Sequence, residues 1–374
     1  MLNPSGSAFG YVHPLCEALT ADGARVTLLT CGAWARELAG LPAPSYTVDP
    51  SFYRRTLAAS RAAGLFGRAA RVARLAEHAA GMARALGLAR RHDVVHVQWL
   101  PVPEVDVAPL HALARLRPLV YTAHNATPHD APPTPAQTAL WRAIYRAPRA
   151  IVAHDAATAG ALTTTFGVPA ERVHRLPHGN FAYLDAHPAP PAPPTDLLAF
   201  GFIGPYKGLD VLLDALPRVR RAVPDVHLRV VGRPRGDVGE VLARVRALAR
   251  EGRAELDERF VPDGALPSLF DAARLVVLPY REISQSGVAV LAATRGRAIV
   301  ASDVGGLGEL VRAAGCGLLA PPGDADALAD AIVALLTDDD ARAACAERGR
   351  AFARGALAWG PIAARTAALY RLIG

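Results

Sequence analysis

Two short stretches in the second half of the chain carry residues suited to holding a diphosphate. Lys207 stands in P-Y-K-G, between an apolar run and a helical pattern, and S-Q-S-G-V at residues 284–288 leads from a buried strand into a second helical pattern. A helix N-terminus has unpaired N–H groups and the positive end of the helix dipole, so it attracts anions. Gly287 has no side chain and lets a phosphate come close. A surface lysine and an ordinary βαβ connection stay open as simpler interpretations of these stretches.

The size and composition of the chain favour two domains. With 374 residues and 51% hydrophobic content the chain can bury two cores, and two cores imply a cleft. No apolar run approaches the roughly 20 residues that span a bilayer, and the N-terminus lacks a secretory pattern. The cysteines lack the spacing of a disulfide or zinc framework; they are Cys16, Cys31, Cys316 and Cys345. We therefore expect a reduced, cytoplasmic protein without a bound metal.

The excess of basic residues is compatible with several anionic partners. The net charge is +7. Arginine alternates with alanine and leucine over residues 54–91, which predicts one or two basic amphipathic helices. Their polar face is either solvated or in peripheral contact with anionic lipid at the inner membrane face or with an anionic acceptor. The arginines are not interleaved with aromatic residues, so we expect no nucleic-acid partner.

Short apolar runs alternate with helical patterns along the chain, which predicts an α/β protein with parallel sheets. A proline-rich stretch at residues 184–196 is typical of a stiff linker. We therefore expect one domain at residues 1–183 and another at residues 197–356. The helical pattern of residues 357–374 is expected to pack back toward the first domain. The first strand has only two residues before the first loop and is expected to be a stub or truncated.

Polar residues of the first half follow predicted strands, and the carboxyl ends of parallel strands are where such sheets place ligands. His124 follows the predicted strand at residues 118–123. The loop at residues 3–10, N-P-S-G-S-A-F-G, is rich in small residues that can cradle a phosphate or an acceptor. Asp130 and Asp155 are the nearest acids, and their spacing marks neither as a general base.

Six motifs, in this order, resemble the retaining family-four glycosyltransferases of the GT-B fold. They are the loop at residues 3–10, Y-T-A-H-N at 121–125, G-V-P-A-E-R-V-H-R-L-P-H-G-N at 167–180, G-F-I-G-P-Y-K-G-L-D-V-L-L-D-A at 201–215, S-Q-S-G-V at 284–288 and A-S-D-V-G-G-L-G-E at 301–309. The resemblance covers nearly the whole chain. It implies two Rossmann-like, doubly wound domains facing each other across a cleft, with the nucleotide-sugar donor on the C-terminal domain.

The resemblance also assigns roles to individual residues. Lys207 is implied to bind the donor diphosphate, and His124 to contact the transferred sugar. The other expected diphosphate ligands are Ser284, Gln285, Ser286, Gly287 and Val288. Nucleotide contacts are expected from Gly232, Arg233, Arg235 and Val261. Contacts on the acceptor or sugar side are expected from Ser5, Gly6, Asn125, His178 and Asn180, although His178 and Asn180 are equally compatible with a structural hinge.

The reaction implied is retaining transfer of a hexose-type sugar from a nucleoside-diphosphate sugar to an acceptor, without metal or cofactor. In the mechanism usually proposed for such enzymes, the acceptor attacks the face that the diphosphate leaves, and the leaving oxygen takes the proton. The acceptor is expected to be a glycan, a lipid-linked sugar or a small molecule. The alternative is a catalytically inactive partner subunit that binds a nucleotide sugar; a sugar-nucleotide epimerase of the same fold is a third reading.

Three departures from the family pattern bear on these expectations. Relatives carry two glutamates around the S-Q-S-G-V loop, and the position of the second, which holds the ribose, is occupied here by Leu291 or Ala292. Relatives resembling G-F-I-R-P-Y-K-G have an arginine where this chain has Gly204. Arg233 or Arg235 is expected to replace that cation. The third departure is the short first strand.

Overall fold

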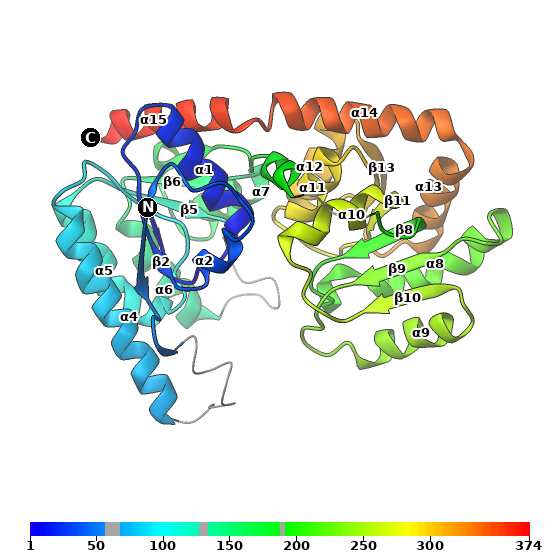
Figure 1. The fold of residues 1–374 in the computed structure, drawn as a ribbon, viewed down its shortest axis with the longest axis horizontal. Coiled ribbons are helices and arrows are strands. Elements are labelled where there is room, and N and C mark those ends of the chain that lie inside the picture. The colour runs from blue at the N-terminus through cyan, green and yellow to red at the C-terminus, as the bar shows by residue number, and fades with distance from the viewer. Residues whose placement is uncertain (57–67, 127–133, 188–190) are drawn as a thin grey trace. The chain divides into compact units, whose positions relative to one another are not determined.

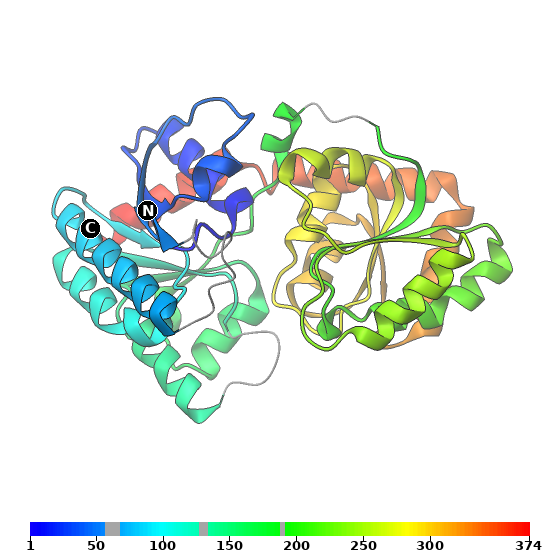
Figure 2. The same ribbon diagram turned by 60° about the horizontal axis from the view of Figure 1, so that its bottom comes forward.

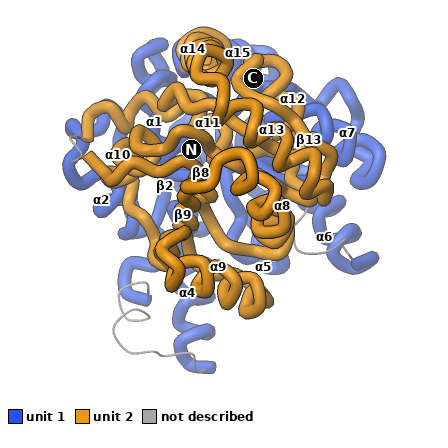
Figure 3. Tube along the Cα trace, turned by 90° about the vertical axis from the view of Figure 1, so that its right-hand side faces the viewer, with its two compact units in different colours: residues 1–179, 359–374 blue, residues 180–358 orange. Residues whose placement is uncertain are grey.

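The computed structural model describes residues 1–56, 68–126, 134–187 and 191–374, which divide into two compact units. Unit 1 comprises Met1–Gly179 and Trp359–Gly374, and unit 2 comprises Asn180–Ala358 (Figure 3). Each unit is described by itself below. None of the described helices combines the length and apolar character needed to cross a membrane.

The core of unit 1 is a parallel sheet of seven strands in the order β3-β2-β1-β4-β5-β6-β7 (Figure 1). The chain starts in the middle of the sheet, builds outward to β3, and then returns to the other side of β1 with β4. The order therefore reverses between β1 and β4, as in a doubly wound domain. The strands are β1 (Leu2–Asn3), β2 (Thr27–Cys31), β3 (Thr47–Phe52), β4 (Val95–Val97), β5 (Leu119–Ala123), β6 (Ala150–Ala153) and β7 (Val173–Arg175).

Helices cover both faces of the sheet of unit 1. Helices α1 (Phe9–Ala21) and α15 (Trp359–Ile373) pack against each other. Leu369 of α15 packs with Val120 and Val152 of the sheet in one hydrophobic cluster. On the opposite face, Leu2 and Tyr121 pack with side chains of the helices that connect β3 to β6. Those helices are α4 (Arg68–Ala89), α5 (Pro103–Leu116) and α6 (Pro135–Arg146). The unit also contains α2 (Trp34–Glu37), α7 (Ala156–Thr164) and the 3-10 turn η1 (Ala170–Arg172).

Unit 2 has a parallel sheet of six strands in the order β10-β9-β8-β11-β12-β13. Here the order reverses between β8 and β11, so the two strands at the switch point are neighbours. The strands are β8 (Thr195–Phe200), β9 (Leu228–Val231), β10 (Ala254–Asp257), β11 (Ala273–Leu278), β12 (Ala298–Ser302) and β13 (Gly317–Ala320).

Helices also lie on both faces of the sheet of unit 2 (Figure 2). In α8 (Leu209–Ala222), Leu209, Leu212, Leu216 and Val219 recur at helical spacing and are buried. Burying one such side chain contributes about 1.5–3 kcal/mol. The remaining helices are α9 (Gly239–Arg250), α10 (Leu266–Asp271), α11 (Gly287–Thr294), α12 (Gly305–Ala314), α13 (Ala325–Thr337) and α14 (Asp339–Gly355), with the 3-10 turns η2 (Ala182–Ala186), η3 (Pro205–Lys207) and η4 (Asp263–Ala265).

The structure agrees with the sequence predictions at the first strand and differs from them at other elements. Strand β3 was not predicted, because it contains Pro50 and is largely polar. The first strand has two residues, as the short apolar start indicated. Unit 2 begins at Asn180 rather than after a linker, since the Asn180 N–H donates to Leu357 O at 2.8 Å and its side chain to Ala353 O at 2.9 Å. The last two residues of the predicted linker are the first two of β8.

Candidate functional site

Lys207 lies at the carboxyl end of β8, next to the point where the strand order of unit 2 reverses. It ends the turn η3, and Gly208 then starts α8 with a φ of +62°. A Cβ at Gly208 would overlap the carbonyl oxygen of Pro279, which follows β11. The glycine therefore allows the lysine turn to pack directly against the end of β11.

The Lys207 ammonium group has a hydroxyl partner but no acidic one in the described parts of the chain. Its Nζ donates to the Tyr280 hydroxyl at 2.6 Å and lies 4.0 Å from the centre of that ring. Burial lowers the pKa of Lys207 to about 7. The nearby Arg281, in contrast, is paired with Asp210 at 2.5 Å. Lys207 is therefore a partly buried cation whose charge a bound anion would offset.

The S-Q-S-G-V stretch forms the loop after β11 and the first turn of α11. Ser286 is the N-cap, and its hydroxyl accepts from the Ala289 N–H at 3.2 Å. No described residue accepts from the N–H groups of Gly287 and Val288. Ser286 also hydrogen-bonds Tyr280, the tyrosine that holds Lys207. One phenol thus links the lysine to the helix N-terminus. A Cβ at Gly201 would lie 3.5 Å from both Lys207 Nζ and Val288 Cγ2, so the lysine and the first turn of α11 border the same glycine.

The glycine pair Gly305-Gly306 packs against the backbone of the loop that contains S-Q-S-G-V. The Gly306 N–H donates to the Ser284 carbonyl at 2.6 Å. Gly305 has a φ of +44°, and a Cβ there would overlap the carbonyl oxygen of Ile283. The motif A-S-D-V-G-G therefore supports the loop through its backbone.

The residues expected near the nucleotide lie along the neighbouring strand ends. Gly232 packs so closely that a Cβ would overlap the Gly201 carbonyl oxygen. The Arg235 N–H donates to Ile203 O at 2.8 Å, and a Cβ at Gly204 would lie 3.6 Å from the Arg235 carbonyl oxygen. Arg235 is therefore beside the position where relatives were expected to carry an arginine. Arg233 is exposed, with its guanidinium 6.0 Å from the ring of Phe260, and Val261 packs partly buried on the core.

In unit 1, His124 follows β5 and joins a group of buried histidines. Its Nδ1 lies 3.3 Å from Nε2 of His154, which follows β6. The ring of Tyr11, from α1, is 4.9 Å from each of these rings and 5.1 Å from His178. Burial lowers the pKa of His154 to about 4 and that of His178 to about 3, and it holds the pKa of His124 well below its usual range. All three rings are therefore neutral near pH 7.

The other residues predicted in the first half have mixed surroundings. Ser5 donates to the Ser7 hydroxyl at 2.8 Å in the loop after β1, and Gly6 has a φ of +67°. Asn125 is partly exposed beside His124, and the His178 ring bonds Gly179 O through Nδ1 at 2.7 Å.

Two further predicted residues turn out to serve the backbone. The Asn180 amide donates to Ala353 O at 2.9 Å and accepts from the Ala182 N–H at 3.2 Å, and both partners belong to unit 2. Asp155 caps α7 and accepts from the Thr158 N–H at 2.7 Å. Asp130 lies outside the described residues.

Two partners of the site were not predicted. Tyr280 belongs to none of the predicted motifs, yet its hydroxyl connects Lys207 to Ser286. His154 was not predicted, although the sequence carries a signal for it: in A-H-N at residues 123–125 and in A-H-D at residues 153–155, the histidine directly follows a strand. Neighbouring parallel strands with the same ending place both histidines at one edge of the sheet.

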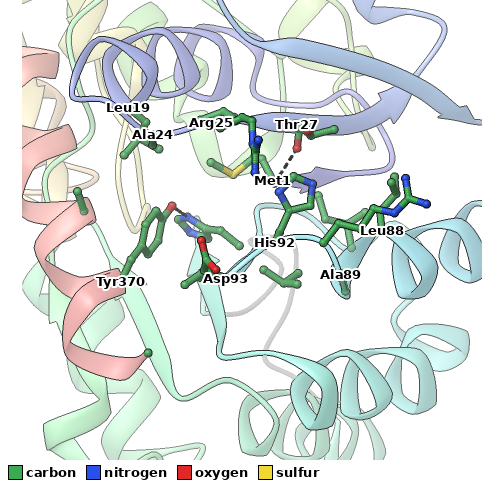
Figure 4. A pocket seen from close by; sticks show the side chains of 18 of the residues that line it. Met1, Leu19, Ala24, Arg25, Thr27, Leu88, Ala89, His92, Asp93 and Tyr370 are labelled. Atoms are coloured by element: carbon green, nitrogen blue, oxygen red, sulfur yellow. Dashed lines mark hydrogen bonds between the residues drawn. The ribbon is translucent and has the colours of Figure 1, made fainter.

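A cavity of about 560 Å³ lies at the amino ends of the central strands of unit 1 (Figure 4). Its lining includes Met1, Thr27, His92 and Tyr370, and the Met1 ammonium group donates to Thr27 O at 2.9 Å. None of the residues predicted to be functional lines it. A much smaller hollow, about 30 Å³, lies against Lys207, Gly201 and Tyr280.

Comparisons with known proteins agree with this arrangement of two doubly wound units. The family model described as "Glycosyl transferases group 1" matches residues 194–338, and the one described as "Glycosyl transferase 4-like domain" matches residues 10–179. The D-inositol 3-phosphate glycosyltransferase 1 of Catenulispora acidiphila is 33% identical over 322 residues, which are 79% of this chain and 75% of the relative. The chain belongs to the group 1 glycosyltransferases and is an enzyme of that family.

Other relatives and solved structures share parts of this pattern. A GDP-mannose:glycolipid 4-beta-D-mannosyltransferase of Xanthomonas campestris pv. campestris is 29% identical over 232 residues, covering 57% of this chain and 62% of the relative. The crystal structure of Anabaena HepE in complex with UDP-glucose matches with a TM-score of 0.73 at 20% identity, covering 99% of this chain and 98% of that one. The structural likeness establishes the GT-B fold, as the sequence motifs indicated.

Proposed function

We propose that this glycosyltransferase moves a hexose-type sugar from a nucleoside-diphosphate sugar to a hydroxyl acceptor with retention of configuration. The observation that carries the proposal is that Tyr280 links the Lys207 ammonium group to Ser286, the N-cap of α11, at the switch point of unit 2. Relatives that use GDP-mannose and a neighbour that binds UDP-glucose support a nucleotide-sugar donor. The inactive-subunit alternative has no observation in its favour.

The arrangement suits a reaction in which a diphosphate leaves an anomeric carbon. As that bond breaks, negative charge develops on the diphosphate, and a fixed cation with preorganised N–H groups stabilises it. We propose that the leaving oxygen takes the acceptor's proton while the acceptor oxygen attacks the same face of the sugar. The Asp155 carboxylate accepts a hydrogen bond from the Thr158 N–H as the N-cap of α7. We therefore assign it no role as a general base, in line with a mechanism that needs none. We also propose that neither a metal nor a cofactor takes part.

We propose that Arg235 supplies the second positive charge on the diphosphate. Its backbone lies beside Gly204, where relatives were expected to carry an arginine. The nucleotide ribose must be held differently from the family pattern, because Leu291 and Ala292 are buried and apolar. A water molecule or a backbone group is then the natural acceptor for the ribose hydroxyls.

The donor site is tested by the thermal stabilisation that UDP and GDP produce at two pH values. Lys207 has a pKa of about 7 without ligand, so its ammonium form is increasingly lost as the pH rises above that value. Between about pH 7 and pH 9 the terminal phosphate stays largely ionised, because its second pKa is about 6. The affinity for whichever of UDP and GDP binds more tightly should therefore decrease with rising pH, by up to about tenfold for each pH unit. Lys207→Met should remove this pH dependence.

Activity completes that test. With UDP-glucose or GDP-mannose as donor, release of the nucleoside diphosphate and an α-linked first product are expected, since retention preserves the donor's configuration. The proposed function would be contradicted if neither UDP nor GDP raised the melting temperature and if no nucleoside diphosphate were released from UDP-glucose or GDP-mannose. A β-linked first product would contradict retention alone.

We propose that the start of α4 contacts an anionic membrane surface and brings the enzyme to a lipid-linked acceptor. Val72 and Leu75 are 66% and 41% exposed, and the neighbouring Arg71 and Arg74 are exposed as well. Apolar and basic side chains together are what interfacial helices present to lipid. In sedimentation with vesicles of phosphatidylcholine and phosphatidylserine, the double variant Val72→Ser/Leu75→Ser should bind severalfold less. Equal binding would argue for a solvated helix face.

A further inference from the structure

The first residues of unit 2 contact both parts of the expected donor site. Residues 181–187, here called the entry segment, contain the turn η2 and belong to unit 2 throughout. The Phe181 ring borders the start of α11, because a Cβ at Gly287 would lie 3.7 Å from its Cζ atom. The Tyr183 hydroxyl donates a hydrogen bond to the Asp263 carboxylate in the turn η4. The entry segment therefore connects the start of α11 to η4 by direct contacts.

Packing against α10 and α11 holds the entry segment in place. The Leu184 side chain is fully buried and packs in one cluster with Leu266 of α10. The Phe181 N–H donates to Thr294 Oγ1 of α11 at 3.2 Å. Tyr183 lies between these two attachments in the sequence, so its hydroxyl has a defined position.

Residues 258–265, the stretch that contains η4, have few other polar attachments to unit 2. They include Val261, which is expected to contact the nucleotide. In the described parts of the chain, the other side-chain hydrogen bonds and ion pairs of this stretch are exposed. They join Arg246 to Glu258 and Arg259 to Asp257. Exposed ion pairs add little stability, because water screens both charges. The bond from Tyr183 to Asp263 is therefore the main side-chain bond available to fix this stretch.

The Asp263 carboxylate is partly withdrawn from water. Burial raises the pKa of the Asp263 carboxyl, and the Tyr183 hydroxyl and His187 act in the opposite direction. His187 packs on the same turn, since a Cβ at Gly264 would lie 3.4 Å from its Nδ1 atom. A hydrogen bond to a charged acceptor is stronger than one between neutral groups, and burial keeps water from replacing it. Loss of the Tyr183 hydroxyl should therefore let residues 258–265 move.

We propose that Tyr183 is a positioning residue of the donor site, which acts through Asp263 to hold residues 258–265 in a fixed place relative to α11. The nucleotide end of the donor would then meet Val261 while its diphosphate lies at the start of α11. In this role Tyr183 contacts Asp263 and not the donor. The inference rests on the proposed function, because these contacts matter to catalysis only if a nucleotide sugar binds unit 2. It predicts an effect on donor binding rather than on turnover of the bound donor.

Tyr183→Phe removes the hydroxyl and keeps the ring, so it tests the bond without changing the packing. The affinity for whichever of UDP and GDP binds more tightly should fall about tenfold. KM for the matching donor, UDP-glucose or GDP-mannose, should rise by about the same factor with kcat unchanged. Inorganic pyrophosphate represents only the diphosphate part, so its affinity should stay the same. Equal losses for pyrophosphate and the nucleotide, or no loss for the nucleotide, would overturn the inference.

Variants of Asp263 and Asp185 separate the hydrogen bond from general damage. Asp263→Asn keeps an oxygen that can accept from Tyr183 and should retain most of the nucleotide affinity, whereas Asp263→Ala should lose as much as Tyr183→Phe. Asp185→Asn is the matched control on the entry segment, because it weakens an exposed ion pair with Arg295, which keeps Asp271 as a partner. It should bind nucleotide like the wild type. If Asp263→Asn and Asp263→Ala lose equal affinity, Asp263 does not act through its bond to Tyr183 and the inference fails.

Hydrogen–deuterium exchange of the full chain without ligand gives a readout that is independent of the proposed function. Amides of residues 258–265 should exchange faster in Tyr183→Phe than in the wild type, and those of α11 should not change. Unchanged exchange would refute the inference, and so would faster exchange with unchanged nucleotide affinity. If neither UDP nor GDP stabilises the wild type, the proposed function fails and the donor role of Tyr183 with it. The exchange rates then still show whether Tyr183 holds this stretch.

Discussion

Replacing Lys207 by Met should lower kcat/KM by about a hundredfold to a thousandfold, the range seen when one preorganised stabilising group is removed from a site. The reason is that Lys207 is the cation that Tyr280 holds beside Ser286, whereas the nearby Arg281 is paired with Asp210. Arg235 is proposed to add only the second charge. Methionine has nearly the length of the lysine stem and keeps the packing. Steady-state kinetics with the donor identified by the nucleotide screen measure the loss.

The same variant should be more stable than the wild type when no ligand is bound. Burial lowers the pKa of Lys207 to about 7 in the folded chain, against an ordinary value near 10.5. Between these values the unfolded chain binds more protons, so this group's contribution to stability rises with pH over that window and is unfavourable below about pH 7. Lys207→Met removes the penalty, so its melting temperature near pH 6 should rise. A variant that melts lower and retains turnover would refute the assigned role.

Replacing Gly208 by Ala should destabilise unit 2 and abolish stabilisation by nucleotides. Gly208 has a φ of +62°, where a side chain costs about 1–2 kcal/mol. In addition a Cβ would overlap the Pro279 carbonyl oxygen, and crowding of that kind costs about 1–3 kcal/mol. The backbone must therefore move, and with it Lys207, the preceding residue. Denaturant unfolding measures the loss of stability, and a thermal-shift titration with UDP and GDP measures the loss of nucleotide binding.

Gly252 provides a matched control for this substitution. It also has a positive φ, +70°, but a Cβ there would have no neighbour within 4 Å. Gly252→Ala should therefore cost only the backbone term of about 1–2 kcal/mol and leave nucleotide binding unchanged. If the two alanine variants lose equal stability and both still bind nucleotide, close packing at Gly208 does not position the lysine.

Much of the fold was predictable because its signals are local. Apolar runs of strand length and helical spacing such as that of Leu209, Leu212 and Leu216 depend only on neighbours in the sequence. Strand β3 was missed because its proline and polar residues resemble a loop; pairing with β2 overrides that local preference. Helices α12 and α14 were not predicted either, since the first was read only as a motif.

The sequence by itself determined the class of each site residue: a lysine in a glycine-bounded turn, small residues at a helix start and a histidine after a strand. These choices are local, because each depends on the backbone a few residues away. Only the tertiary structure decided the partners. Tyr280 meets Lys207 across 73 positions, and His154 meets His124 across 30. Such pairs arise because parallel strands bring their carboxyl ends to one edge of a sheet, and the order of strands is set by the packing of the whole unit.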